Sequence, residues 1–390
     1  MAKQFIEGSM AIALGASLTR PDVISAYPIT PQTHIVEDLA QIVADGQLKT
    51  QFINTESEFG AASVVLGALA GGVRAYTATT SQGLILMSEV LFNCAGMRLP
   101  LLMCCANRSL SAPLSIWSDQ QDVMAMRDSG FILGFAEDAQ EALDLHIIGM
   151  KIAQDERVQL PYMVNVDGFL ITHTFETVDV PTQEEVDKFL PPYKPFQMLD
   201  PSAPMSLGCF TEPSHHMEAR YLMHKANVDS LPIIEQVSKD FEKAFGRKAG
   251  GLVQGYKLDD AEVVLVAMGS TTGLLEEVVD QQRDMGKKTG LLKIKTFRPF
   301  PEETVKAALG NKKQVIVFDK AMSAGVGEIL GSEIRAALYN LPNKPPVDSY
   351  IYGLGGRDII ESQFHTVIAN PNPGTHRSEW IGLKKELVED

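Results

Sequence analysis

Short runs of apolar residues alternate with longer segments of helical character along most of the chain. In the first half these runs are D-V-I-S-A-Y, Q-F-I-N, V-R-A-Y-T-A, P-L-L-M-C-C-A, F-I-L-G-F and P-Y-M-V-N-V. Such alternation is typical of a parallel sheet covered by helices. The clearest helix is predicted over residues 137–155, where Leu143, Ile147 and Met150 recur at helical spacing and His146 is assigned to the polar face.

From about residue 175 the alternation of strand-like and helical segments becomes irregular. The proline-rich segments P-P-Y-K-P-F and D-P-S-A-P-M found here cannot form long helices or central strands. A helical region over 215–245 follows. The strand-like runs A-E-V-V-L-V-A-M, T-G-L-L-K-I-K and Q-V-I-V-F-D then restart the α/β alternation. A chain of 390 residues also exceeds the usual size of one hydrophobic core. We therefore predict two α/β domains, residues 1–255 and a smaller one at 256–390.

The composition of the chain argues against some classes of binding partner. Hydrophobic residues make up 45% and charged residues 21%, as in an ordinary globular protein. The net charge of -15 and the lack of a basic stripe argue against nucleic acid as a partner. No run approaches the roughly 18 apolar residues of a membrane span, and the first residues lack the layout of a signal peptide. We expect a cytoplasmic protein without a membrane partner.

The cysteines and histidines predict no metal site made by this chain alone. The four cysteines show no C-x-x-C spacing, and Cys104 and Cys105 lie in an apolar run where buried reduced thiols are expected. The eight histidines are scattered apart from one adjacent pair, and H-E-x-x-H is absent. The turn V-A-M-G-S-T-T-G could attract an anion, but we favour a plain strand-to-helix turn because no phosphate-loop or dinucleotide fingerprint is present.

Two short stretches have both a structural and a chemical interpretation. In N-T-E-S-E-F-G-A-A, Thr55 and Glu58 match the capping box that begins many helices. In Y-P-I-T-P-Q-T, two prolines fix the backbone around Thr30 directly after a strand-like run, which would place it at the carboxyl edge of a parallel sheet. The structural alternatives are that Glu58 only caps a helix and that Thr30 is only a helix cap in a turn.

Five motifs in order give the chain a family resemblance: Y-P-I-T-P-Q-T, S-E-F-G-A-A, T-S-Q-G-L, A-N-R-S-L-S-A-P and S-I-W-S-D-Q-Q-D. Together they resemble the α subunit of the pyruvate:ferredoxin oxidoreductases, members of the thiamine-diphosphate-dependent 2-oxoacid:ferredoxin oxidoreductase family. The resemblance continues to Y-G-L-G-G-R-D and so covers nearly the whole chain. It implies a thiamine-diphosphate-binding fold, with a pyrimidine-binding domain followed by a smaller transketolase C-terminal-like α/β domain.

The resemblance also implies roles for individual residues. Glu58 would bond the pyrimidine N1′ of thiamine diphosphate and promote the imino tautomer that activates the cofactor, and desolvation among small neighbours would favour the protonated form that this role needs. Thr30 and Arg108 would hold the substrate carboxylate, to which arginine presents a planar fork of donors. Tyr27, Pro28 and Ile29 are assigned to cofactor binding. An isolated arginine would more simply be a structural or surface ion pair.

Missing motifs indicate that the chain is half of an active site. The G-D-G…N pattern that holds the diphosphate and Mg²⁺ is absent, since V-D-G-F lacks the first glycine, and so are cysteines for [4Fe–4S] clusters. The resemblance implies that a β subunit supplies the diphosphate and Mg²⁺ site, that γ and ferredoxin-like δ subunits complete the complex, and that partners carry the clusters. The complete enzyme would convert a 2-oxoacid, coenzyme A and oxidised ferredoxin into acyl-coenzyme A, CO₂ and reduced ferredoxin, reversibly.

Three hypotheses about function stay open. The 2-oxoacid is pyruvate in the first; in the second it is 2-oxoisovalerate, 2-oxoglutarate or oxalate. In the third the chain is a catalytically silent scaffold subunit. The segment after Arg108 is expected to line the substrate pocket, and Gln120-Gln121-Asp122 stands there where the family often shows His-Gln-Asp. The second domain is predicted to be an oligomerisation and scaffold element with little direct chemistry.

Overall fold

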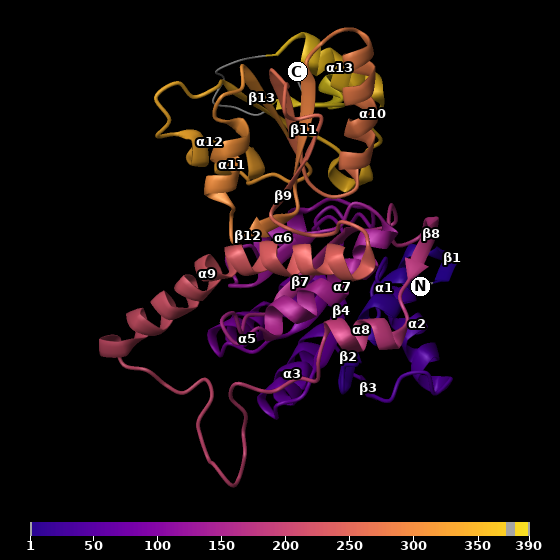
Figure 1. The fold of residues 1–390 in the computed structure, drawn as a ribbon, viewed down its shortest axis with the longest axis vertical. Helices are drawn as coiled ribbons and strands as arrows, with labels where there is room; N and C mark the ends of the chain where they lie inside the picture. The colour runs from indigo at the N-terminus through magenta and orange to yellow at the C-terminus, as the bar shows by residue number, and fades with distance from the viewer. Residues whose placement is uncertain (1, 372–378, 389–390) are drawn as a thin grey trace.

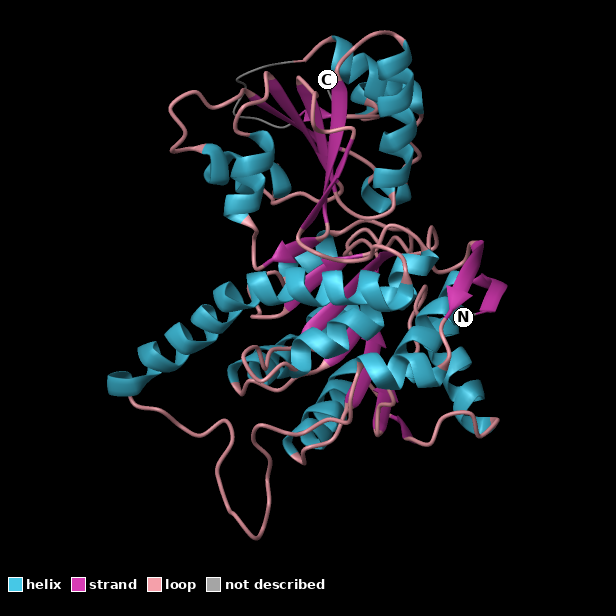
Figure 2. Ribbon diagram, in the orientation of Figure 1, coloured by secondary structure: helices cyan, strands magenta, loops and turns pink. Residues whose placement is uncertain are grey.

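Two large sheets, beside a two-stranded antiparallel ribbon near the N-terminus, organise the chain in the computed structural model, which describes residues 2–371 and 379–388. Each sheet is covered by helices, and the two units lie one above the other (Figures 1 and 2). The strands are β1 Ala2–Glu7, β2 Val23–Ala26, β3 Gln51–Asn54, β4 Ala75–Thr79, β5 Leu102–Asn107, β6 Ile132–Phe135, β7 Tyr162–Asp167, β8 Phe175–Val180, β9 Val253–Tyr256, β10 Val263–Ala267, β11 Thr289–Ile294, β12 Thr296–Arg298, β13 Gln314–Asp319, β14 Val347–Ile351 and β15 Glu379–Trp380.

The helices are α1 Gly8–Leu18, α2 Thr33–Ala44, α3 Glu58–Ala70, α4 Ser81–Leu86, α5 Ser88–Gly96, α6 Gln121–Ala125, α7 Ala139–Gln154, α8 Gln183–Phe189, α9 Pro213–Phe245, α10 Thr271–Asp284, α11 Glu302–Leu309, α12 Leu330–Leu338 and α13 Glu361–Ala369, with 3₁₀ turns η1 Leu354–Gly356 and η2 Lys385–Leu387. Within the described residues, no helix is both long enough and apolar enough to cross a lipid bilayer.

The first sheet has seven strands in the order β12-β6-β7-β5-β4-β2-β3. All neighbouring strands are parallel except β12, which pairs antiparallel with β6 at one edge. Every residue of the central strands β4, β5 and β7 is buried, as expected for a parallel sheet with helices on its faces. The predicted alternation is confirmed, and Cys104 and Cys105 are buried free thiols as expected.

Helix α7 crosses this domain and packs against α1 and α9. Its N-cap is Asp138, whose side chain accepts from the Glu141 backbone N–H at 2.7 Å. The prediction that His146 lies on a polar face is wrong: the ring is fully buried. Its Nδ1 lies 2.6 Å from the Ala142 carbonyl and its Nε2 lies 3.1 Å from the Tyr76 hydroxyl of β4. Burial lowers the pKa of His146 to about 4, so the ring is neutral at pH 7.

The second sheet has six described strands in the order β15-β14-β13-β10-β11-β9, parallel except for β9. Helices α10 and α13 pack together beside it, and α11 and α12 form a second pair on the other side (Figure 1). The turn V-A-M-G-S-T-T-G joins β10 to α10, with Gly269 at φ 69° in the left-handed region. It is a strand-to-helix turn, as favoured from the sequence.

The two sheets do not divide at a single point of the chain. Strand β9 spans residue 255 and belongs to the second sheet, whereas β12, forty residues later in the C-terminal half, belongs to the first. The run from Thr289 to Arg298 therefore supplies β11 to one sheet and β12 to the other. This shared run ties the two units together through backbone hydrogen bonds.

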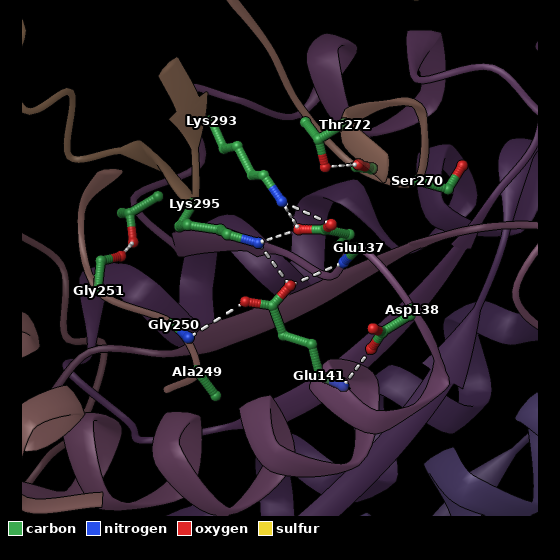
Figure 3. Close-up of polar contacts among 12 residues, drawn as sticks. Glu137, Asp138, Glu141, Ala249, Gly250, Gly251, Ser270, Thr272, Lys293 and Lys295 are labelled. Carbon is green, nitrogen blue, oxygen red and sulfur yellow. Dashed lines mark hydrogen bonds and ion pairs between the residues drawn. The ribbon is translucent and has the colours of Figure 1, made fainter. Parts of the chain in front are cut away.

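A buried ion network fills the junction beside this run (Figure 3). The Lys293 ammonium lies 2.6 Å from Glu137 and 2.7 Å from Glu276. The Lys295 ammonium lies 2.9 Å from Glu137 and 2.8 Å from Glu141. Burial alone would raise the pKa of Glu137, but the two lysines, Lys295 foremost, hold it below its usual value. The two lysines thus keep the Glu137 carboxylate charged in a place where water solvates it poorly.

We expect Lys295→Met to destabilise the chain by about 3–5 kcal/mol, because it leaves the buried Glu141 without its lysine partner and Glu137 with only one of its two. The measurement is the urea midpoint of unfolding. Lys188→Met is the matched control, since Lys188 pairs with Glu184 on the exposed surface of α8 and its loss should leave the midpoint almost unchanged. Equal midpoints for both variants would contradict a stabilising role for the network.

Candidate functional site

The predicted site residues all follow strands of the first sheet at the same end. Thr30 comes after β2, Glu58 directly begins the helix after β3, and Arg108 directly follows β5. These strands are neighbours in the order β5-β4-β2-β3 and run parallel. Carboxyl ends of parallel strands meet at one edge of a sheet, which is where open α/β folds place ligands. The fold therefore gathers the three residues on one edge.

Glu58 is the first residue of α3 and is buried. The capping-box interpretation is wrong: the N-cap is Ser57, whose hydroxyl accepts from the Gly60 N–H at 3.1 Å. The Thr55 hydroxyl instead donates to the Ser57 carbonyl at 3.0 Å. Among the described residues, the Glu58 carboxylate has no hydrogen-bond partner, so helix capping does not account for it.

Helix α4 lies against Glu58 through Gly83. A Cβ built on Gly83 would lie 2.5 Å from Thr79 Oγ1 and 2.7 Å from Glu58 Oε1, closer than real Cβ contacts. Only glycine therefore fits here without moving the carboxylate. Gln82, the preceding residue, accepts from Arg108 through its side-chain oxygen. The first turn of α4 is thus in contact with Glu58 on one side and with Arg108 on the other.

Arg108 is buried and its guanidinium reaches across to the Thr30 turn. Its Nε, Nη1 and Nη2 donate to the Ser115 carbonyl, the Thr30 carbonyl and the Gln82 side chain at 3.2, 2.7 and 3.3 Å. No described acidic group forms an ion pair with it, so the ion-pair alternative does not describe this arginine. Since a guanidinium has five N–H donors, these contacts leave one N–H on each of Nη1 and Nη2 without a partner among the described residues.

The turn that carries Tyr27, Pro28 and Ile29 is fixed by Gln32, which the sequence reasoning missed. The fully buried Gln32 side chain accepts from the Ile29 N–H at 3.2 Å and donates to the Ala78 carbonyl of β4 at 2.6 Å. Gln32 is also the residue before α2, so Thr30 is not its N-cap and the capping alternative fails. The sequence feature that could have indicated this role is the position of Gln32, a polar residue directly after the segment P-I-T-P.

Asp122 is a second contributor whose role the sequence reasoning did not find. Its fully buried carboxylate accepts from the backbone N–H groups of Ser81 at 2.9 Å and Arg108 at 3.0 Å. It also accepts from the Asn107 side chain at 3.0 Å. Burial raises the pKa of Asp122, and these N–H donors oppose that shift. One carboxylate therefore fixes the turns after β4 and β5 relative to each other.

The second domain contacts the segment that follows Arg108. Backbone N–H groups of Gly355 and Gly356 donate to the Asp119 carboxylate and the Ser118 carbonyl at 3.0 and 2.9 Å. The Gln120 N–H donates to the Lys320 carbonyl at 2.8 Å. Burial raises the pKa of Asp119 to about 6, and the backbone N–H donors of Gln121 and Gly355 partly offset that shift. The C-terminal domain thus holds residues 118–120 by hydrogen bonds. These residues belong to the segment after Arg108 that is expected from the sequence to line the substrate pocket.

A cleft of about 890 Å³ lies between the domains beside these hydrogen bonds. It is lined by Trp117 from the segment after Arg108 and by Lys320, Tyr352, Arg357 and Asp358 from the second domain. Arg357 and Asp358 therefore face the domain junction. The prediction that the second domain is an oligomerisation and scaffold element with little direct chemistry stays a prediction.

Asp167, the aspartate of the V-D-G-F segment, forms contacts across the same junction. One carboxylate oxygen lies 3.0 Å from the Lys320 ammonium, and the other accepts from the Ser270 N–H and hydroxyl at 2.8 and 2.7 Å. Burial acts to raise the pKa of Asp167, but Lys320 and Ser270 hold it below its usual value. Its oxygens are thus used in joining the two domains.

Together, the fold and the site define a thiamine-diphosphate-binding α/β protein with a second α/β domain. The family model described as "Pyruvate flavodoxin/ferredoxin oxidoreductase, thiamine diP-bdg" matches residues 14–239, and "Pyruvate:ferredoxin oxidoreductase core domain II" matches residues 261–364. The chain belongs to the pyruvate flavodoxin/ferredoxin oxidoreductase family. The resemblance and the fold class predicted from the sequence are confirmed.

Similar curated proteins extend over nearly the whole chain. Pyruvate synthase subunit PorA of Methanothermobacter thermautotrophicus is 49% identical over 99% of this chain and 100% of its own length. PorA of Methanosarcina barkeri is 47% identical over 98% of this chain and 97% of its own. Ketoisovalerate oxidoreductase subunit VorA of Pyrococcus horikoshii is 40% identical over 92% and 90%. Subunits for two different 2-oxoacids are therefore both close in sequence.

A solved structure supports the fold. The 2-oxoglutarate:ferredoxin oxidoreductase from Magnetococcus marinus, determined with 2-oxoglutarate, coenzyme A and succinyl-CoA bound, matches with a TM-score of 0.72 at 20% identity. The match covers 94% of this chain and 65% of that chain. The fold of this chain is therefore one part of that larger polypeptide.

We expect Gly83→Ala to weaken thiamine diphosphate binding and activity in the assembled enzyme, because the added methyl must displace Thr79 or the Glu58 carboxylate. Overpacking of this kind costs about 1–3 kcal/mol. Gly67→Ala is the control: Gly67 lies inside α3, and a Cβ there meets nothing within 4 Å, so it should be neutral or slightly stabilising. Cofactor titration measures both, and wild-type affinity in Gly83→Ala would contradict the contact.

Proposed function

We propose that this chain is the α subunit of a thiamine-diphosphate-dependent pyruvate:ferredoxin oxidoreductase. The complete enzyme converts pyruvate, coenzyme A and two oxidised ferredoxins into acetyl-coenzyme A, CO₂ and two reduced ferredoxins, and it can run in reverse. The observation that carries the proposal is the placement of Glu58, Arg108 and the Thr30 turn on one sheet edge, in a chain 49% identical to a pyruvate synthase subunit.

The residues fit the pyrimidine half of thiamine diphosphate. The buried Glu58 carboxylate has no hydrogen-bond partner among the described residues, and Gly83 lets helix α4 pack directly against it. Tyr27, Pro28 and Ile29 lie on the same edge, on the turn after β2. When bound, the cofactor supplies a nucleophilic carbon for the substrate carbonyl and an electron sink for decarboxylation.

Glu58 exchanges a proton with the pyrimidine in this proposal. A carboxyl group beside a ring nitrogen can share a proton with that nitrogen. The fixed start of α3, capped by Ser57, keeps the side chain at one place on the edge. Glu58 therefore sets the protonation of the pyrimidine.

Arg108 orients the substrate. Its remaining N–H groups on Nη1 and Nη2 suit a bidentate carboxylate, and its three contacts to protein oxygens hold the plane of the guanidinium. Thr30 contacts Arg108 through its backbone carbonyl, which leaves the exposed Thr30 hydroxyl for the substrate. A substrate carboxylate at Arg108 would lie on the same edge as Glu58.

Partner subunits complete the proposed enzyme. We assign the diphosphate and Mg²⁺ site to a β subunit, which fits the commitment of Asp167 to Lys320 and Ser270. We assign the [4Fe–4S] clusters to partners as well: Cys94, Cys104 and Cys105 are buried, and burial raises the pKa of each thiol. Cluster ligands must be thiolates. The γ and δ subunits and ferredoxin would dock on this assembly.

Another 2-oxoacid is the second candidate, because the VorA subunit is also 40% identical. Activity of the purified complex on pyruvate, 2-oxoisovalerate, 2-oxoglutarate and oxalate, with a viologen acceptor and coenzyme A, separates the candidates. We expect the highest kcat/KM on pyruvate. The same preparation tests the silent-subunit alternative, since inactivity on every substrate would favour a scaffold role.

We expect Glu58→Gln to lower turnover about 10²–10⁴-fold, the usual contribution of a general acid or base, while the complex stays assembled. The amide keeps the shape of the side chain but cannot exchange the proton. Glu89→Gln is the control, because Glu89 is also in the first turn of a helix but is exposed. Exchange of the C2 proton of bound cofactor is the direct measurement; wild-type exchange in Glu58→Gln would remove Glu58 from the mechanism.

We expect Arg108→Lys to lower kcat/KM for pyruvate about 10- to 150-fold, the value of a charge-assisted hydrogen bond of about 1.5–3 kcal/mol. Lysine keeps the charge and loses the fork. Arg98→Lys is a matched control, since Arg98 also donates to two backbone carbonyls but lies away from this edge. Thiamine diphosphate affinity should be unchanged in both, and unchanged pyruvate kinetics in Arg108→Lys would show that this arginine is structural.

A further inference from the structure

Three potential metal ligands from distant parts of the sequence meet beside the N-terminal ribbon. They are Glu7 at the end of β1, His34 in the first turn of α2, and His173 between β7 and β8. One ligand atom from each lies within 4.8 Å of the other two. All three side chains are partly buried rather than fully exposed. None of the three belongs to the set of residues assigned above to the Glu58 and Arg108 site.

The backbone fixes this arrangement. Strands β1 and β8 pair antiparallel, with Glu7 opposite Phe175, and the Ser9 N–H donates to the Thr172 carbonyl at 2.9 Å. These bonds hold the end of β1 against the His173 loop. The two imidazole rings stack with centroids 4.6 Å apart, and His34 Nδ1 lies 3.0 Å from Glu7 Oε1.

We propose that Glu7, His34 and His173 form a binding site for a late first-row divalent transition metal, with Zn²⁺ as the representative ion. Two imidazoles and one carboxylate are ligands that Zn²⁺ and its neighbours prefer, whereas Mg²⁺ and Ca²⁺ prefer oxygen alone. Two ligands on a tetrahedral Zn²⁺ with bonds of about 2.0–2.1 Å are about 3.3 Å apart. The 3.0 Å between His34 Nδ1 and Glu7 Oε1 already approaches this spacing.

The charges around the cluster favour a cation. Asp38, one turn after His34 on α2, adds a second carboxylate near Glu7. His173 donates to or accepts from the Thr172 hydroxyl through Nδ1 at 2.7 Å, which leaves its Nε2 as a ligand atom.

A metal here would tie the ribbon to the segment that precedes α2. Thr30 and Pro31 lie three residues or more before His34, and Gly168, at the start of the His173 loop, packs on Pro31 so closely that a Cβ would lie 2.6 Å from its ring. The ion would thus join β1, the loop and α2 in one unit. This inference does not depend on the reaction that the sheet edge performs.

Cobalt(II) titration of the full-length, chelator-treated chain tests the site, because tetrahedral Co²⁺ reports its ligands in the visible spectrum. We expect one Co²⁺ per chain, displaced by Zn²⁺, with affinity at least about 10-fold lower in His34→Asn and in His173→Asn. Glu7→Gln should also weaken binding, and it serves as the test if a histidine variant fails to fold. A rise in melting temperature with Zn²⁺ should follow the same order.

Two control variants remove the competing ligands. His215→Asn with His216→Asn deletes the adjacent histidine pair on the exposed start of α9, and Cys209→Ser deletes the exposed thiol. Both should bind Co²⁺ as the wild type does. Absence of stoichiometric binding, binding that persists in His34→Asn and His173→Asn, or binding lost in either control would overturn the proposal and leave Glu7 and His34 as a plain ion pair.

Discussion

The candidate site depends on one buried carboxylate, that of Asp122. A charge without solvent is stable only when donors surround it, and here the donors are the N–H groups that begin the turns after β4 and β5. Satisfying Asp122 therefore fixes where α4 begins and where Arg108 leaves the sheet. The contacts of Gly83 with Glu58 and of Gln82 with Arg108 follow from that constraint.

The second domain also helps to fix these turns, through hydrogen bonds to the segment that precedes α6. Its glycine turn at Gly355 and Gly356 and its Lys320 carbonyl hold the segment 118–120 from the side away from the sheet. The segment is therefore confined between two domains rather than left as a surface loop. Changes at the junction would reach Asp122 and Arg108 through this short path, because the segment leads directly into α6 and Asp122.

Much of this architecture could be predicted from the sequence, because buried parallel strands have continuous runs of apolar residues. The carboxyl ends of such strands also lie at the same edge of the sheet. That rule placed Thr30 at the carboxyl edge of the sheet, whereas Glu58 and Arg108 were assigned to the site through the family resemblance. Partners distant in sequence could not be predicted: His146 is buried because Tyr76, seventy residues away, meets its ring. The helix start at Glu58 was misassigned because Ser57, in extended conformation, caps the helix in place of Thr55. The roles of Gly83 and Gln82 depend on side-chain packing that no spacing encodes.

The shared run of β11 and β12 bears on whether the two domains can exist apart. A fragment ending at residue 255 would lack β12, so the edge of β6 would present unpaired N–H and C=O groups of the kind that recruit strands from other molecules. It would also lack Lys293 and Lys295, leaving Glu137 and Glu141 buried without counter-charges. The first domain alone is therefore an incomplete folding unit. The ten residues Thr289–Arg298, which lie in the C-terminal half of the chain, complete its sheet edge and pair its buried carboxylates.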